Sequence, residues 1–283
     1  MTMKLRFLLL VSLLTELILT APCLAQATDT PLESIDALRQ RAQMGDVSAQ
    51  RMLGSDLLND GDSSDDEEGL DWLRRAARSG DWSSAYYLGQ AYLYRWHSLS
   101  DDDTLTETIE WLRMAAQNVP PDNEVANDLY ALLGRLYSGF ELRDVRGHYP
   151  PLDDEEAIKW YRICAAGYDS YCQRELGDLL LKSPATAAEG YRWLRHAADL
   201  AHPEAMFELG ELYAAGDIVK KDNVQSLAWF ERAQKWNPGD GGYGQDLRYR
   251  VERKIAEISR PLSPVDIAKA NDMAADFHPV HHY

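Results

Sequence analysis

The chain has 283 residues, of which 46 are acidic and 29 are lysine or arginine, giving a formal net charge of −17. This excess of negative charge repels nucleic acid and anionic lipid surfaces, so we do not expect either as a partner.

The first 27 residues have the features of a secretory signal peptide. Lys4 and Arg6 supply a positive start, residues 7–20 are largely apolar, and residues 25–27 (Ala-Gln-Ala) offer a cleavage site. We therefore expect a periplasmic protein with a cleaved leader and no membrane span after cleavage.

A membrane-spanning helix and a lipoprotein signal are the two alternatives to a cleaved leader. The apolar segment is shorter than the roughly 20 residues of a membrane-spanning helix, and Glu16 interrupts it. Cys23 could be lipidated, but Pro22 stands where a lipoprotein signal wants a small residue, so simple cleavage is favoured.

After a predicted capping helix at residues 34–46, the sequence pattern of one helix recurs five times between residues 47 and 236. In each copy a potential helix cap is followed three places later by Glu or Gln, which is the spacing of a capping box. A Trp follows seven places after the cap. The copies are Asp65-Glu68-Trp72, Thr104-Glu107-Trp111, Asp153-Glu156-Trp160, Thr186-Glu189-Trp193 and Asp222-Gln225-Trp229. We call these the trailing helices.

Apolar residues complete one stripe on each trailing helix. Eight places after the cap stands a large residue, and eleven places after it a small one. The large residues are Leu73, Leu112, Tyr161, Leu194 and Phe230, and the small ones are Ala76, Ala115, Cys164, Ala197 and Ala233.

A second amphipathic helix, the leading helix, precedes each trailing helix and centres on a Leu-Gly pair. A glycine inside a helix costs about 1 kcal/mol relative to alanine. Five glycines at the same place therefore predict a close helix crossing rather than a break. They are Gly54, Gly89, Gly134, Gly177 and Gly210.

The connections vary in length, and we expect loops to absorb the extra residues while the helices keep their length. The predicted inserts are residues 94–103, the stretch around 119–122, and residues 138–152.

Acidic runs at 60–68, 101–103 and 153–156 are interpreted as solvated loops and helix starts, where acids suit the helix dipole. Attraction to a basic partner is the alternative.

These motifs resemble the Sel-one-like repeat family, whose pattern is roughly A-x-x-x-L-G-x-x-Y-x-x-G, a loop ending in Asp, then A-x-x-W-x-x-K-A-A. The best copy is AMFELGELYAAGDIVKKDNVQSLAWFERA, residues 205–233. The resemblance covers residues 47–235 and implies an all-α, right-handed superhelical solenoid of antiparallel helix pairs, related to tetratricopeptide repeats. The chain departs from the family by losing the glycine-rich turn of the first repeat and by lengthening loops in the second and third.

By analogy with tetratricopeptide relatives, the leading helices line the inner face. Inward positions are expected two residues before the Leu and one after the Gly: Arg51 and Ser55, Tyr86 and Gln90, Ala131 and Arg135, Arg174 and Asp178, Phe207 and Glu211, with Tyr94 one turn further on. Their mixture of aromatic and arginine side chains is typical of a protein-binding surface. The alternative for Tyr86 and Phe207 is packing against the next repeat.

A second candidate contact is the insert at residues 138–152. It carries Phe140, Arg143, Arg146 and Tyr149.

Cys164 and Cys172 occupy the small-residue place of one trailing helix and the opening of the next leading helix. These positions should face each other, and the pair is similar to that of the cysteine-rich secreted branch of the family. In an oxidising compartment we expect a disulfide; two buried free thiols are the alternative if export fails.

The chain should end in two capping helices within residues 244–276 and a tail at 277–283. Pro264 after Ser263 marks the start of the last helix.

Signatures of catalysis are missing from the sequence. It has no nucleophile elbow, phosphate-binding glycine loop or zinc spacing, and we expect no enzyme activity and no cofactor. His278, His281 and His282 could together hold a metal, but a disordered tail is favoured.

The resemblance implies a periplasmic adaptor or regulator that holds a partner protein. The alternative is an immunity protein that neutralises a periplasm-acting toxin, such as a phospholipase effector of the type six secretion system. The family resemblance implies both roles, and the residues alone do not choose between them.

Overall fold

A computed structural model describes residues 34–59, 66–99, 102–139, 152–237, 239 and 242–280. Within these ranges the chain forms thirteen α-helices and no strand. The leading helices are α3 (Val47–Asn59), α5 (Trp82–Leu99), α7 (Ala126–Ser138), α9 (Ser170–Leu181) and α11 (Pro203–Ala215). The trailing helices are α4 (Asp66–Arg78), α6 (Asp102–Asn118), α8 (Asp154–Ala166), α10 (Ala187–Asp199) and α12 (Asn223–Trp236).

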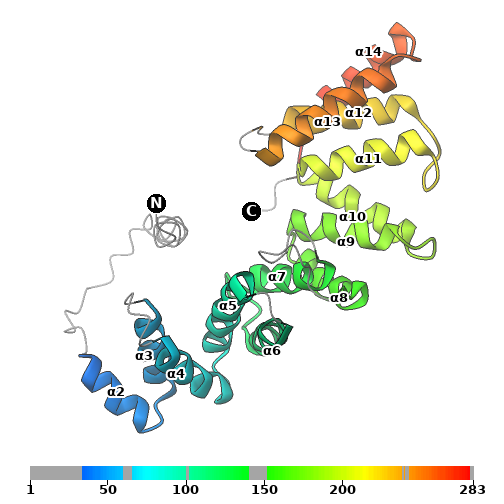
Figure 1. Cartoon of the computed structure of the whole chain (residues 1–283). Coiled ribbons are helices and arrows are strands. Elements are labelled where there is room, and N and C mark those ends of the chain that lie inside the picture. The colour runs from blue at the N-terminus through cyan, green and yellow to red at the C-terminus, as the bar shows by residue number, and fades with distance from the viewer. Residues whose placement is uncertain are drawn as a thin grey trace.

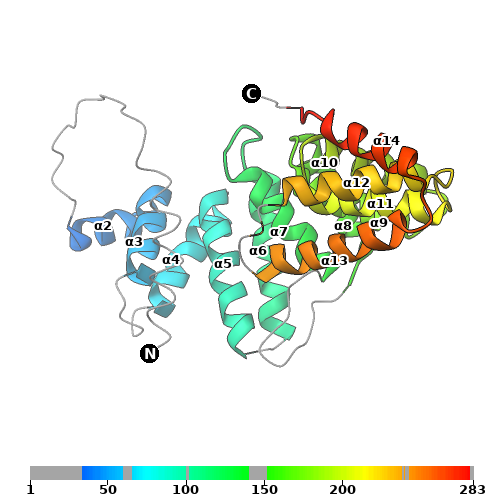
Figure 2. The same ribbon diagram turned by 90° about the horizontal axis from the view of Figure 1, so that it is seen from above.

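Each leading helix packs against the trailing helix that follows it, and successive pairs stack along a curved path from blue to red in Figure 1. Helix α2 (Ile35–Gln43) packs on α3 at the front of the stack. At the other end α13 (Gly242–Ser259) and α14 (Pro264–Ala275) both pack on α12, as Figure 2 shows. The predicted all-α solenoid of antiparallel helix pairs is confirmed.

The five Leu-Gly glycines are sites of close helix crossing, as expected. A Cβ atom added at Gly54, Gly134, Gly177 or Gly210 would lie 2.5–2.7 Å from the large residue at the eighth place of the paired trailing helix, and one at Gly89 would collide with Leu112. These large residues and the small ones at the eleventh place are all completely buried. The repeat pattern thus encodes the contact within each helix pair.

The predicted caps of the trailing helices are only partly present. Asp153 accepts hydrogen bonds from the N–H groups of Glu155 and Glu156, and Asp222 caps α12 in the same way. Thr104 is not a cap, because α6 already begins at Asp102.

Thr186 precedes α10, but its side chain accepts no backbone hydrogen bond there. Its hydroxyl instead donates to the carbonyl of Leu180, 2.6 Å away. Asp65 lies outside the described residues.

The glutamate of the repeated motif has a different role from the one that the sequence predicts. Instead of closing a capping box, Glu68, Glu156 and Glu189 accept hydrogen bonds from the indole N–H of the tryptophan four residues later, at 3.0, 3.2 and 3.3 Å. Gln225 takes the place of this acid in the last copy, where the N–H of Trp229 has no hydrogen-bond partner among the described residues. In these three copies the Glu and the Trp are therefore an i, i+4 side-chain pair.

Replacing Glu156 with alanine should therefore lower the free energy of unfolding by about 1–2 kcal/mol, because the N–H of Trp160 would stay buried without its acceptor. Glu155→Ala is the matched control, since Glu155 lies in the same first turn but is exposed. Urea unfolding of both variants measures the difference. Equal decreases in the free energy of unfolding would show that the negative charge near the helix start, and not the bond to Trp160, stabilises the protein.

The turns into four of the five leading helices, all except that into α7, share a cap that was not predicted from the sequence. Asp46, Asp81 and Asp169 accept a hydrogen bond from the backbone N–H three residues later, at 3.0, 2.9 and 2.8 Å, and His202 does so through Nδ1 at 3.4 Å. The residue before each cap has a positive φ, and these residues are Gly45, Gly80, Tyr168 and Ala201. The Gly-Asp pairs at 45–46 and 80–81 would have allowed this turn to be predicted from the sequence.

The second repeat lengthens its helices rather than its loop. Residues 94–99 continue α5 and residues 102–103 belong to α6, so the prediction of a loop over 94–103 is wrong for these residues. The stretch after α6 is a connection without helix, as expected. Helix α13 starts at Gly242, slightly before the predicted 244.

Candidate functional site

The two N-terminal leading helices leave a cavity of about 410 Å³ between them. It is lined by Arg51, Met52, Ser55 and Asp56 of α3 and by Trp82, Ser83 and Tyr87 of α5. Met52 is 46% exposed and Tyr87 43%. These two large side chains lie one residue before the Leu of their repeats, next to the column that the sequence predicts to face inward.

The same side of α5 carries further exposed residues. Gln90 and Tyr94, three and seven places after Tyr87, follow helical spacing, and Tyr94 is 52% exposed. We call the exposed set Met52, Tyr87, Gln90 and Tyr94 the open face. Gln90 and Tyr94 were predicted from the sequence, whereas Met52 and Tyr87 were not.

The other predicted contacts in this half of the chain are less accessible. Arg51 forms an ion pair with the capping Asp81 at 2.9 Å, so its charge already has a partner. Tyr86 is half-buried, and burial followed by the nearby carboxylate of Asp128 raises the pKa of its hydroxyl. Arg135 is half-buried as well.

At the C-terminal end, α13 covers the leading helix α11. The guanidinium of Arg250 lies 4.4 Å from the centre of the Phe207 ring and 3.3 Å from Glu204, and Lys254 pairs with Glu211 at 3.0 Å. Phe207 is only 6% exposed and also contacts Phe230. Of the two interpretations of Phe207, packing is the one that the structure supports, because α13 covers the ring.

Arg174 is buried too, and its contacts correct the expectation of an exposed arginine. Its guanidinium binds Glu208 at 3.0 Å and Asp178 at 2.9 Å, lies 3.6 Å from Glu204, and makes a close ion pair with Glu175. Its side chain is 9% exposed. This cluster, which we call the Arg174 cluster, ties α9 to α11 rather than presenting a charge to a partner.

Burial and charge shift the pKa values in this region. Burial lowers the pKa of Arg174, but the surrounding carboxylates outweigh it and raise that pKa overall. Burial, together with the neighbouring Asp178, raises the pKa of Glu208 well above its ordinary value. Burial and the charge of Arg174 lower the pKa of His202 to about 4, so this capping imidazole is neutral near pH 7.

The second candidate contact, with Phe140, Arg143, Arg146 and Tyr149, lies outside the described residues.

A disulfide joins Cys164 of α8 to Cys172 of α9, with 5.8 Å between the Cα atoms. The bridge spans the turn between the third and fourth repeats, where the sequence placed the pair. Both residues are completely buried.

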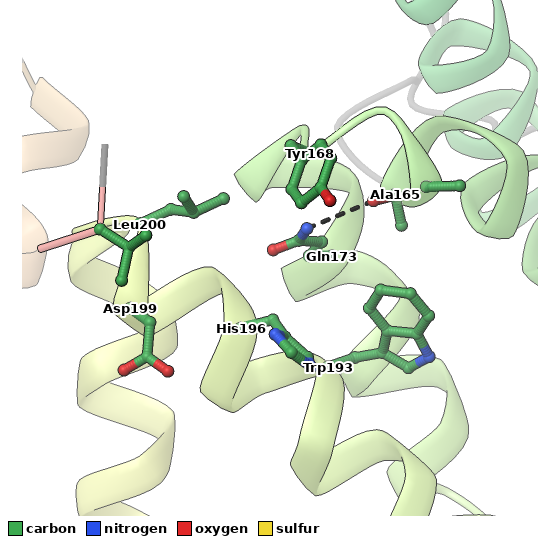
Figure 3. Close-up of a pocket in the computed structure, with 9 residues that line it drawn as sticks. Ala165, Tyr168, Gln173, Trp193, His196, Asp199 and Leu200 are labelled. Carbon is green, nitrogen blue, oxygen red and sulfur yellow. Dashed lines mark hydrogen bonds between the residues drawn. The ribbon is translucent and has the colours of Figure 1, made fainter. Parts of the chain in front are cut away.

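A second cavity, of about 310 Å³, lies beside this turn (Figure 3). Tyr168 and Gln173 line it on one side and Trp193 and His196 on the other, and Gln173 donates to the carbonyl of Ala165. Val280 closes it from the C-terminal tail, where its N–H donates to the carbonyl of Asp199 at 2.8 Å.

Among the described residues, a single cluster could offer three metal ligands, and it consists of Cys164, Asp169 and Cys172. His278 takes no part in such a cluster, and His281 and His282 lie outside the described ranges. None of the described helices combines the length and the apolar character that crossing a membrane requires.

Comparison with known proteins agrees with this architecture. The family model described as Sel1 repeat matches residues 47–81, 82–119, 144–167 and 203–233. The pair α9–α10 lies outside these matches, although its helices pack as the other pairs do.

Solved structures with a similar fold include a Sel1 repeat protein from Oxalobacter formigenes, at 24% identity and a TM-score of 0.57, over 85% of this chain and 65% of that one. A protective antigen of uropathogenic Escherichia coli with an SLR fold matches at 24% identity and a TM-score of 0.49, over 86% and 48%. An immunity protein from Pseudomonas aeruginosa matches at 12% identity and 0.33, over 79% and 83%. The chain thus covers about two thirds of the length of the Oxalobacter formigenes protein and about half of the length of the Escherichia coli antigen. A search of the curated proteins finds no match.

Proposed function

Because the chain is a Sel1 repeat protein, we propose that it works without catalysis and holds a partner protein on the open face. Proteins built from this repeat generally mediate protein–protein interactions. The observation that carries the proposal is the exposure of Met52, Tyr87 and Tyr94 on neighbouring leading helices. Tyrosine and methionine are enriched at protein interfaces.

The two ends of the stack differ, and this difference supports the open face as the contact. At the C-terminal end Glu204, Glu211 and Phe207 are already matched by residues of α13. The corresponding part of α3 and α5 carries large side chains that remain accessible. A partner would find there the apolar area and hydrogen-bonding hydroxyl groups that an interface anchor needs.

We place this function in the periplasm as an adaptor or regulator, on the strength of the signal-like residues 1–27. The disulfide between Cys164 and Cys172 suits an oxidising compartment.

Replacing Met52 and Tyr87 together with alanine should weaken capture of the partner at least tenfold, because truncating anchor residues at an interface typically costs more than 1 kcal/mol each. The measurement is a pull-down from periplasmic extract followed by titration of the captured protein. Tyr249→Ala is the control, since Tyr249 is 65% exposed but lies on α13. Unchanged capture by the folded double variant would reject the open face and direct attention to Tyr86 and Arg135.

The immunity role predicts a different binding affinity and a different growth phenotype. An immunity protein should bind one enzyme with nanomolar or tighter affinity, and its loss should kill cells only beside toxin-producing kin. Loss of an adaptor should alter envelope assembly or signalling in pure culture. Competition growth of a deletion strain therefore separates the two roles.

A further inference from the structure

The turn between α8 and α9 brings together three residues of the kinds that bind transition metals. Cys164 lies in the last turn of α8, Asp169 caps α9, and Cys172 lies in its first turn. One ligand atom from each of the three, the two sulfurs and a carboxylate oxygen, lies within 4.8 Å of the other two.

The carboxylate of Asp169 is held in place by the backbone. Its Oδ1 accepts a hydrogen bond from the N–H of Cys172 at 2.8 Å, which fixes the side chain beside the sulfur atoms. Hydrogen bonds of this kind orient metal-binding carboxylates and strengthen metal binding. Asp169 is half-buried while both cysteines are fully buried, so an ion would enter from the carboxylate side.

Two thiolates and one carboxylate form a ligand set suited to zinc. Zn²⁺ binds Cys sulfur at about 2.3 Å and carboxylate oxygen at about 2.0–2.2 Å in tetrahedral geometry, which puts neighbouring ligands roughly 3.5–4 Å apart. The three ligand atoms lie within 4.8 Å of one another, and the two sulfurs, which are bonded to each other here, would move apart after reduction to bind the ion. A set of three protein ligands leaves the fourth position to water.

We propose that Cys164, Asp169 and Cys172 form a zinc site when their disulfide is reduced. The oxidised bridge and the zinc-bound dithiolate are then two alternative states of the same turn. This site is independent of the protein-binding role, because it lies between the third and fourth repeats and shares no residue with the open face.

The two steps balance with a dithiol reductant. Thiol–disulfide exchange transfers two electrons from the reductant, which becomes a disulfide, and leaves Cys164 and Cys172 as thiols. Zn²⁺ then displaces the two thiol protons, and both Zn–S bonds form without further redox change.

The test uses the full mature chain, reduced with a phosphine, desalted without oxygen and titrated with Co²⁺ and then Zn²⁺. The reduced protein should show a thiolate-to-cobalt charge-transfer band that Zn²⁺ abolishes, and should retain about one zinc ion per chain after desalting, measured by elemental analysis. The oxidised protein should retain none. Absence of metal from the reduced, folded protein would overturn the proposal.

Asp169→Asn tests the third ligand without removing the helix cap, since an amide oxygen can still accept from the N–H of Cys172. Zinc affinity should fall at least tenfold. The matched control is Asp222→Asn, which makes the same change at the cap of α12, where Asp222 accepts from Val224 and Gln225. Equal affinity of Asp169→Asn and wild type would refute the role of the carboxylate, and loss of the charge-transfer band in Cys164→Ser would support the role of the thiolate.

Discussion

Replacing Arg174 with methionine is expected to lower the free energy of unfolding by about 3–5 kcal/mol at neutral pH. The change leaves Glu175, Glu204 and Glu208 buried or nearly so without the cation that they share, and Asp178 loses its partner as well. Removing one partner of a buried ionic cluster costs more than the cluster itself contributes, because the remaining charges stay desolvated.

The matched control is Arg162→Met. Arg162 also bridges two repeats, to Glu189 at 3.0 Å, but its side chain is 48% exposed. Loss of an exposed pair should cost no more than about 1 kcal/mol, because water and salt screen it. Chemical denaturation measures the free energy of unfolding of both variants. Similar decreases in the two would contradict the buried character of the Arg174 cluster.

The cost of Arg174→Met should depend on pH in a defined direction. The pKa of Glu208 is raised in the folded protein by burial and by Asp178, and loss of Arg174 raises it further. A raised carboxyl pKa contributes stability that is present below the unfolded value, about 4.3, and is lost as pH rises through the folded value. The free energy of unfolding of the variant should therefore be closest to that of wild type below about pH 4.3 and furthest from it at neutral pH and above.

A methyl group added at Gly54 should destabilise the first helix pair by about 1–3 kcal/mol. The new Cβ would lie 2.7 Å from Cγ of Leu73 and 2.8 Å from the backbone oxygen of Gly69 on α4. The side chain could rotate away, but the backbone oxygen could not, so the helices must separate and lose packing. The gain of about 1 kcal/mol in helix propensity from Gly to Ala offsets only part of this loss.

Ser55→Ala provides the control for Gly54→Ala, because it makes a similar change on the next residue of α3, which is only half-buried. Its effect should stay within about 0.5 kcal/mol. Thermal and urea unfolding of the two variants test this difference. A stabilised Gly54→Ala would mean that α3 and α4 are not in close contact.

The part of the fold that repeats along the chain was open to prediction from the sequence. The Leu-Gly and Trp phases predicted the helix pairs, the contacts at the glycines and the completely buried small residues. Cys164 and Cys172 were placed on facing helices by the same phase, and they do meet. These features depend on helical periodicity and on contacts between neighbouring helices, both of which local spacing encodes.

The role of the motif glutamate was mispredicted because the spacing of a capping box also suits another pair. Glu156 lies three residues from Asp153 and four from Trp160, and both partners are within its reach. The structure shows that it binds the indole N–H, while Asp153 alone caps the helix. A buried N–H needs an acceptor, whereas helix-start N–H groups can be satisfied by one carboxylate and water.

The sequence by itself determined that the chain is a stack of helix pairs, because the two helices of each pair follow one another directly in the sequence. Only the tertiary structure decided which side chains of the leading helices remain accessible. Phe207 and Arg174 look the same in the repeat pattern as Tyr86 and Arg51, but Phe207 is covered by Arg250, 43 positions further along, and Arg174 by Glu208 of the next repeat. Burial depends on which distant element packs on a surface, and no local spacing carries that information.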